Sequence, residues 1–240
     1  MPGSAYVALS GMRTRLDQLD RLASDIANVG TAGYKGERTS DAEADRTTFD
    51  TMLQSAIDVT GGGRRLDTSA GAIAPTGRDL DLAIEGKGFF VVQTPAGIRY
   101  TRNGRFSRQS DGTLATEDGS AVQSADGKPI TVPSGHLEIA ADGTVSSGGN
   151  VAGKLALVEF SDPGQLVRES RATLRSDGAA PQPATGSTVR SGALEESNVS
   201  VGDRIAALTE VMRTFEALQK AVSLQMNDLD GRAIDVLGRR

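Results

Sequence analysis

The stretch FFVVQTPAGIRYT, residues 89–101, contains two short apolar runs separated by a turn with Pro and Gly. Runs of this length that are rich in Val, Ile, Phe and Tyr and bounded by turn residues are typical of β-strands. We therefore expect strands at 89–93 and 98–101, and a third at 155–160, which reads LALVEF. The middle of the chain is predicted to be all-β.

Turn signals continue through the same region. Asn-Gly occurs at 103–104, and Asp-Gly occurs at 111–112, 118–119, 126–127, 142–143 and 177–178. These dipeptides favour type I′ hairpin turns, because both central residues of such a turn need a positive φ. Their close spacing predicts short antiparallel strands joined by tight turns.

Both ends of the chain have a helical pattern. Between about Ser4 and Val29, apolar residues alternate at spacings of three and four, which are the a and d positions of a heptad. A second such stripe runs from about Val199 to Leu229, with Ser197 or Asn198 as the expected N-cap. Each stripe is too apolar to be stable alone in water, so each helix needs a partner.

The predicted fold class is therefore α+β. The N- and C-terminal heptad helices are expected to pack as a coiled-coil-like rod domain made of residues 1–35 and 193–240. They flank an extended linker region at 36–79 and a central all-β domain with Asp-Gly hairpin turns at 80–192, which includes a second linker.

Composition excludes several classes of function. The 240 residues include no Cys, no Trp and one His, which excludes disulfides, thiolate sites and sites built from several histidines. A net charge of −5 gives no general attraction to nucleic acid or to an anionic membrane. No apolar run is long enough to span a membrane, and the N-terminus lacks the basic start and apolar stretch of a secretory signal.

No motif carries catalytic or cofactor chemistry. Glu195 and Glu196 are adjacent, so they would not face each other on a helix, and a place near a helix N-terminus explains them. A lone His136 makes neither a metal site nor a triad. Gly86-x-Gly88 lacks the rest of a dinucleotide fingerprint. We expect no catalytic residue, no metal and no cofactor.

Four arginines at spacings of three allow two interpretations. Arg99, Arg102, Arg105 and Arg108 lie across a predicted hairpin and could form an intersubunit ion-pair patch. The simpler interpretation is a solvated face, because isolated surface pairs contribute only ~0–1 kcal/mol.

Four segments, in order along the chain, resemble the family of bacterial flagellar rod and hook proteins. They are IANVGTAGYK at 26–35, DLAIEGKGFFVV at 81–92, YTRNGRF at 100–106 and LEESNV at 194–199. The resemblance covers nearly the whole chain. The sequence departs from the family at Ser24-Asp25, where paired Asn is common, and at Gly30.

The resemblance implies a non-enzymatic structural subunit of the proximal basal-body rod, which polymerises axially to join the motor to the hook. Its partners would be copies of itself and other rod subunits, with motor-side and hook-side rod proteins as further candidates. It would have no nucleic acid, membrane or small-molecule partner. Export would use the flagellum-specific channel without a cleaved signal, into the rod that spans the periplasm.

Two alternatives remain. One is a distal rod or hook subunit. The other is a secreted β-domain that binds or hydrolyses glycans, although a glycan groove usually exposes Trp or several Tyr, and this chain has no Trp and 3 Tyr.

Assembly contacts are expected from the two apolar stripes and from the turn after the first helix. In that turn, Gly33 would supply the turn itself, Tyr34 a buried anchor and Lys35 a favourable charge at the helix end. The predicted assembly residues are Leu9, Met12, Leu16, Leu19, Ile26, Asn28, Gly33, Tyr34, Lys35, Val201, Ile205, Leu208, Met212, Phe215, Val222, Met226 and Leu229.

Overall fold

The computed structural model describes residues 2–39, 64–133 and 135–237. These residues divide into two compact units. The helical unit contains the described residues of 1–27, 39 and 200–237, and the β unit contains those of 28–38 and 64–199.

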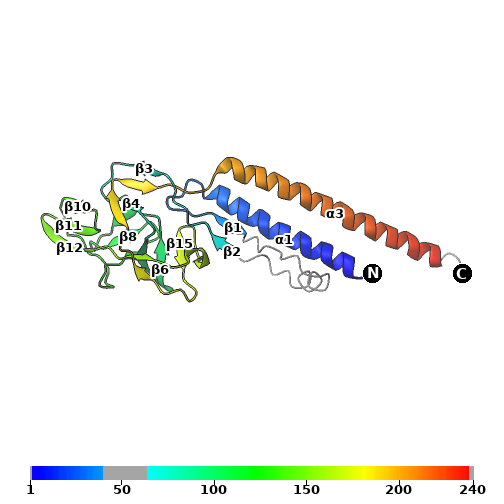
Figure 1. The fold of residues 1–240 in the computed structure, drawn as a ribbon, viewed down its shortest axis with the longest axis horizontal. Coiled ribbons are helices and arrows are strands. Elements are labelled where there is room, and N and C mark those ends of the chain that lie inside the picture. Colours follow the sequence, from blue (N-terminus) through cyan, green and yellow to red (C-terminus); the bar gives the residue numbers. More distant parts are fainter. Residues whose placement is uncertain (1, 40–63, 134, 238–240) are drawn as a thin grey trace. The chain divides into compact units, whose positions relative to one another are not determined.

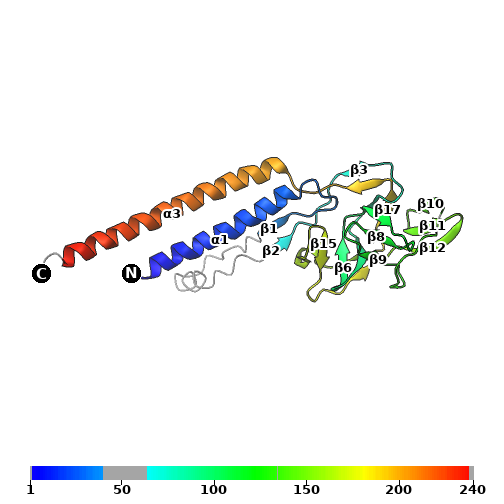
Figure 2. The same cartoon turned by 180° about the vertical axis from the view of Figure 1, so that it is seen from behind.

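The helical unit consists of α1 (Pro2–Ala27) and α3 (Val201–Leu237), which pack against each other and run antiparallel (Figures 1 and 2). The backbone N–H of Asp203 donates to the Ser200 hydroxyl at 3.4 Å, so Ser200 is the N-cap of α3, two or three residues later than expected. Asp203 lies in the first turn, where a negative charge is favourable. None of the described helices combines the length and apolar character needed to cross a membrane.

The expected coiled-coil-like packing of two heptad helices was wrong. The described residues form one N-terminal and one C-terminal α-helix, with a β-rich region between them in the sequence, and several residues of the predicted seams are exposed. On α1, Leu9 and Leu16 are 58% and 48% exposed, and on α3, Ile205 is 50% exposed. The α+β combination of elements is present, but without the heptad pair.

The physical reason is that the face that each helix buries overlaps only partly with the stripe that its apolar spacing marks. On α1 the buried side chains are Leu22 and Asp25, and on α3 the buried side chain is Val211, whereas the predicted seam residues are at most half-buried. Arg204 Nε lies 3.1 Å from Asp25 Oδ2, so the inner face includes an ion pair. A pattern of apolar spacing alone does not reveal such a polar contact.

The β unit is built mainly on one sheet. Within its described residues, nine strands join in the order β14-β15-β6-β5-β9-β8-β7, with β13 paired to β5 and β16 paired to β13. The pairs in this sheet are antiparallel. The strands are β5 (Phe89–Thr94), β6 (Gly97–Thr101), β7 (Phe106–Arg108), β8 (Leu114–Thr116), β9 (Ala121–Val122), β13 (Leu157–Glu159), β14 (Val167–Arg168), β15 (Thr173–Arg175) and β16 (Gln182–Pro183). Strands β5 and β6 coincide with the expected pair at 89–93 and 98–101.

Smaller sheets surround the large one (Figure 2). A three-stranded sheet joins β10 (Leu137–Ile139), β11 (Thr144–Ser147) and β12 (Asn150–Lys154). Three two-stranded sheets pair β1 (Glu37–Thr39) with β2 (Arg64–Leu66), β3 (Ile73–Pro75) with β18 (Ala193–Glu195), and β4 (Leu82–Glu85) with β17 (Thr188–Ser191). A short 3₁₀ helix, η1 (Pro163–Gln165), precedes β14.

Two apolar clusters form the core of the β unit. The larger includes Leu82, Phe90 and Phe106, with the Phe90 and Phe106 rings edge to face at 5.1 Å between centroids. The smaller includes Phe89, Tyr100 and Phe160. Because Phe89 and Phe90 alternate along β5, one strand contributes to both clusters.

The Asp-Gly turns differ in type from the prediction. Type I′ would need a positive φ at Asp, yet no described residue other than Gly has one. Instead, the N–H groups of Gly112, Gly119, Gly127 and Gly143 each donate to the carbonyl three residues earlier, and each of these glycines has a positive φ. This is the pattern of a type I turn with Gly at its last position.

The prediction of a hairpin at Asn103-Gly104 was also wrong, because β6 and β7 are not paired with each other. Instead, Gly104 allows its own backbone to lie against the backbone of Leu82. Leu82 N donates to Gly104 O at 2.9 Å, and a Cβ at position 104 would lie 1.7 Å from Leu82 O.

Candidate functional site

The turn after α1 brings Lys35 into the β unit. Thr31 N donates to Asn28 O at 3.0 Å, and Gly33 then turns the chain with a φ of +65°. A Cβ at Gly33 would lie 2.2 Å from the Arg102 carbonyl carbon, so only glycine fits this backbone contact. Gly33 N donates to Glu195 O at 2.7 Å, which positions the next residues, Tyr34 and Lys35, in the interior.

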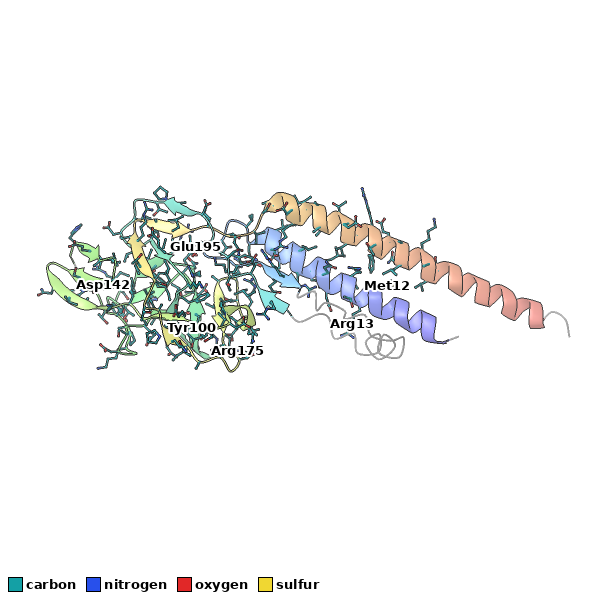
Figure 3. The ribbon with its side chains drawn as sticks, viewed as in Figure 1. Met12, Arg13, Tyr100, Asp142, Arg175 and Glu195 are labelled. Carbon is teal, nitrogen blue, oxygen red and sulfur yellow. The ribbon has the colours of Figure 1, made fainter. Side chains whose placement is uncertain are left out.

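Lys35, Arg102 and Glu195 form a buried ionic cluster, which we call the ionic junction. Lys35 Nζ lies 2.5 Å from Glu195 Oε1, and Arg102 Nη1 lies 3.0 Å from Glu195 Oε2. The three side chains are at most 4% exposed. One carboxylate, on the last residue of β18, therefore bridges two cations from distant parts of the chain (Figure 3 labels Glu195).

Backbone groups complete the coordination of these charges. Lys35 Nζ donates to Ser69 O at 2.6 Å, and Gly71 N donates to Glu195 Oε1 at 3.0 Å. Arg102 donates to Ile84 O at 3.3 Å and to Gly86 O at 2.6 Å. Buried charges are tolerated only when they are paired and hydrogen-bonded, and these bonds meet that requirement for most of the polar atoms. Arg102 Nε is the exception, because it is buried without a hydrogen-bond partner.

The junction carries one more positive than negative charge. Burial lowers the pKa of Lys35 below its ordinary value, against the opposing effect of the Glu195 carboxylate. Burial likewise lowers the pKa of Arg102, again opposed by Glu195. A buried pair of this kind is weak evidence for net stability, since desolvation offsets much of the attraction. The junction instead favours one specific arrangement of its three side chains, because displacing any one of them leaves a buried charge without its ionic partner.

A second set of contacts surrounds the junction. Asn198 Oδ1 accepts from Gly36 N at 2.8 Å, while its Nδ2 donates to Asp67 O at 2.8 Å. Arg168 lies over the Tyr34 ring at 4.1 Å and donates to Lys35 O. The segments 33–36, 67–71 and 195–198 are therefore held together.

The arrangement has no features of an active site. Both Glu195 oxygens are engaged and the side chain is almost fully buried, so no substrate can reach it. Among the described residues there is no group of three or more side chains that could hold a metal ion. The junction is a positioning device rather than a reaction centre.

The structure separates the predicted assembly residues into two groups. Gly33, Tyr34 and Lys35 belong to the junction region, and Tyr34 is a buried anchor as expected, whereas Lys35 is an internal partner of Glu195 and not a charge at the helix end. Asn28 accepts a hydrogen bond from Thr31. The other predicted residues lie on the two helices.

On the helices, the predicted residues range from exposed to half-buried. Five are exposed, namely Leu9, Leu16, Val201, Ile205 and Met212. Six are half-buried, namely Met12, Leu19, Ile26, Leu208, Phe215 and Val222. Met226 and Leu229 lie in α3, but their side chains are outside the described residues.

Sequence reasoning missed two members of the junction. Arg102 was assigned to a surface patch or a solvated face, and Glu195 to a helix N-terminus. The four arginines do not form one patch, because Arg99 pairs with Glu169 and Arg102 pairs with Glu195. The available signal was their place inside the YTRNGRF and LEESNV segments, in which several apolar residues, Tyr100, Phe106, Leu194 and Val199, are also buried.

Comparisons with known proteins agree with the earlier resemblance. Residues 83–147 match the family described as flagellar hook protein FlgE/F/G D1 domain, and residues 190–235 match flagellar basal body rod FlgEFG protein C-terminal. The chain is 35% identical to the flagellar basal-body rod protein FlgF of Caulobacter vibrioides, over 100% of this chain and 99% of that protein.

Two further relatives extend the comparison. The FlgF protein of Rhizobium meliloti is 33% identical over 99% of both chains. The flagellar basal-body rod protein FlgG of Bacillus subtilis is 33% identical, over 92% of this chain and 94% of that protein. Similarity of this extent along whole chains shows that this chain belongs to the family of FlgF flagellar basal-body rod proteins, and that it is a structural subunit of the rod.

Proposed function

We propose that the subunit enters the proximal rod through its two helices, which contact neighbouring subunits along the axis. The observation that carries this proposal is the exposure of large apolar side chains on both helices, namely Leu9, Leu16, Val201, Ile205 and Met212. Burying such a side chain stabilises a contact by roughly 1.5–3 kcal/mol, so leaving five in water is costly unless a partner covers them.

The ionic junction has a complementary role in this proposal. It fixes residues 33–36 and 195–198, which lie in the β unit a few residues after the end of α1 and before the start of α3. The segments of the β unit that connect to the two helices would thus be fixed before the subunit assembles. The predicted division into a polymerisation domain of 1–35 and 193–240, a linker region at 36–79 and a β-domain at 80–192 belongs to the same proposal.

We also propose that the subunit has no catalytic activity and that its partners are other rod subunits. Relatives are named as flagellar basal-body rod proteins, which supports a structural subunit that is not an enzyme and that binds copies of itself and other rod subunits. These names also support a location in the basal-body rod. The proposal further includes passage across the periplasm through the flagellar export channel without a cleaved signal. Similarity to a FlgG protein keeps a distal position as the second candidate.

The experiment is complementation of a strain from which the gene for this chain has been deleted. Deletion alone is expected to abolish motility and to stop assembly before the hook, as seen in isolated basal bodies. Rods that reach the hook without this chain would contradict the function.

A paired variant tests the helical contacts. Ile205→Asn with Met212→Asn places amides in the exposed stripe, and it is expected to block rod completion while the purified protein keeps its circular dichroism spectrum. The control is Glu210→Asn with Arg213→Asn, two exposed polar positions of the same helix outside the stripe. Equal swimming by the two variants would overturn the proposed role of the stripe.

A further inference from the structure

Three segments of the β unit are joined to one another by many polar contacts. They are residues 33–36, 67–75 and 193–199, which we together call the latch. The first segment follows α1, which ends at Ala27, and the last precedes α3, which begins at Val201. Both chain connections to the helices therefore run through the latch.

Hydrogen bonds link each latch segment to the other two. Strand β3 of the second segment pairs with β18 of the third. Asp67 N donates to Gly36 O at 2.8 Å, and Asn198 N donates to Tyr34 O at 3.3 Å. The Glu195 carboxylate accepts bonds from both of the other segments. The latch is therefore cross-linked internally, as a single body would be.

The latch lies outside the apolar clusters that form the core of the β unit. Neither cluster contains a latch residue, although Tyr34 and Leu194 are buried. A backbone bond from Ala193 N to Asp81 O, 3.2 Å long, joins the latch to the rest of the unit. Segments outside the main apolar clusters open at a lower free energy than the strands that build those clusters.

Two arginines from strands of the large sheet also hold the latch. Arg102, directly after β6, lies 3.0 Å from Glu195. Arg168, on β14, lies over the Tyr34 ring and donates to Lys35 O. Because desolvation offsets much of the attraction within a buried ion pair, such contacts fix the position of the latch more than they add to net stability.

The latch contacts also join distant parts of the chain. Lys35 and Glu195 are 160 positions apart, and Gly36 and Asn198 are 162 positions apart. Strands β5 and β6, in contrast, pair across a short turn. Closing a longer loop costs more conformational entropy, so contacts of this kind are expected to form after the hairpins of the large sheet and to be lost before them.

We infer that the latch opens and closes as one unit while the large sheet stays folded, and that Arg168 helps to hold it closed. Opening releases the chain connections to α1 and α3 in a single event. The inference goes beyond the proposed function, because it concerns the isolated chain and does not depend on contacts with neighbouring subunits.

Separate opening is tested by thiol labelling of the purified full chain. The chain has no cysteine, so one introduced thiol reports on one position. Ala193 in the latch and Ala115 on β8 of the large sheet are each 1% exposed, which makes Ala193→Cys and Ala115→Cys matched probes. A thiol reagent is expected to react faster at position 193. Equal rates, or a faster reaction at position 115, would overturn the inference.

Arg168→Met tests what holds the latch closed. It is expected to speed labelling at position 193 about tenfold, the change that follows loss of one hydrogen bond from a charged group, and to leave position 115 unchanged. Arg175→Met is the control, since Arg175 is exposed, lies on β15 of the same sheet and pairs with Asp177. No change at position 193, or an equal change at both positions, would contradict the assigned role of Arg168.

Movement as one unit is tested by hydrogen exchange, followed for single amides by NMR. Gly36, Gly71 and Glu196 each donate a backbone bond within the latch and represent its three segments. In Arg168→Met their exchange is expected to accelerate by one common factor, while Val91 on β5 keeps its rate. Acceleration confined to Gly36, in the segment that Arg168 contacts, would show that the segments open separately and would rule out a single latch.

Discussion

Lys35 and Glu195 are 160 positions apart in the chain, yet Lys35 Nζ lies 2.5 Å from Glu195 Oε1 in the interior of the β unit. Arg102 bonds to the other oxygen of the same carboxylate. Glu195 therefore holds together segments from near the start, the middle and near the end of the chain. Loss of either contact leaves a charge buried, so the junction tolerates one arrangement of these segments.

Glu195→Gln is expected to destabilise the β unit more than Lys35→Met. Without the carboxylate, two buried cations lose their counter-charge, whereas without Lys35 the Glu195–Arg102 pair remains. We expect a loss of about 3–5 kcal/mol in the free energy of unfolding for Glu195→Gln, measured by urea denaturation of the full chain.

The control is Arg190→Met, which breaks an exposed pair with Glu85 at 3.7 Å. Its cost should be within ~1 kcal/mol, as for other surface pairs. If Lys35→Met proved more costly than Glu195→Gln, the view of Glu195 as the shared partner would be wrong.

Gly104→Ala tests the close approach of two backbone segments. An added Cβ would lie 1.7 Å from the carbonyl oxygen of the fully buried Leu82, so the chain must shift. We expect a loss of at least about 3 kcal/mol, since overpacking typically costs ~1–3 kcal/mol and backbone leaves little room to adjust. Thermal unfolding followed by circular dichroism would measure it.

Gly186→Ala is the matched control. At that position nothing lies within 4 Å of the added Cβ, and the φ is not in the left-handed region. Its stability should be unchanged or raised by about 0.4–1 kcal/mol, because alanine restricts the unfolded chain. Similar losses for both variants would show that flexibility, and not space, is what glycine provides at position 104.

Local chemistry allowed part of the fold to be predicted. Apolar runs identified β5 and β6, and the Asp-Gly dipeptides marked positions where the chain turns. Even there the turn type was wrong. Glycine alone carries the positive φ, whereas the prediction assumed that aspartate shares it. Sequence spacing locates a turn, but strand pairing around it selects the type.

The rest depends on contacts that no local pattern contains. Charged residues are mostly exposed, so Lys35, Arg102 and Glu195 would each be assigned to the surface from sequence. They are buried because they contact one another although they lie far apart in the sequence. Arg102 and Glu195 are 93 positions apart, and Lys35 and Glu195 are 160 positions apart. The helix seams failed for a related reason, because apolar spacing does not reveal that the Asp25–Arg204 ion pair shares the inner face of the two helices.

The Asp25–Arg204 pair offers an asymmetric test in the helical unit. The Asp25 side chain is 3% exposed and that of Arg204 is 24% exposed. Arg204→Met leaves a buried carboxylate without its guanidinium, while Asp25→Asn leaves a cation that water can still reach. We expect losses of about 3 kcal/mol and about 1 kcal/mol respectively, seen as faster hydrogen exchange in α1 and α3.

Arg213→Met, at an exposed position of α3, is the control and should leave exchange unchanged. Exchange in the strands of the β unit should be the same in all three variants. Greater protection in Arg204→Met than in Asp25→Asn would contradict the assigned role of the buried carboxylate.

Glu169 gives a prediction for pH dependence. The hydrogen bond from Arg99 lowers the pKa of Glu169 below its ordinary value, aided by the Arg99 charge. A carboxyl group with a lowered pKa in the folded state stabilises that state above its unfolded pKa, about 4.3, and this contribution is lost as pH falls through the folded pKa. Wild type should therefore unfold at a higher temperature than Glu169→Gln at pH 7, and the difference should shrink as the pH is lowered below about 4. A calorimetric series from neutral to acid pH measures it, with Glu138→Gln, an exposed glutamate, as the control. A difference that grows toward acid pH would have the wrong sign for this pair.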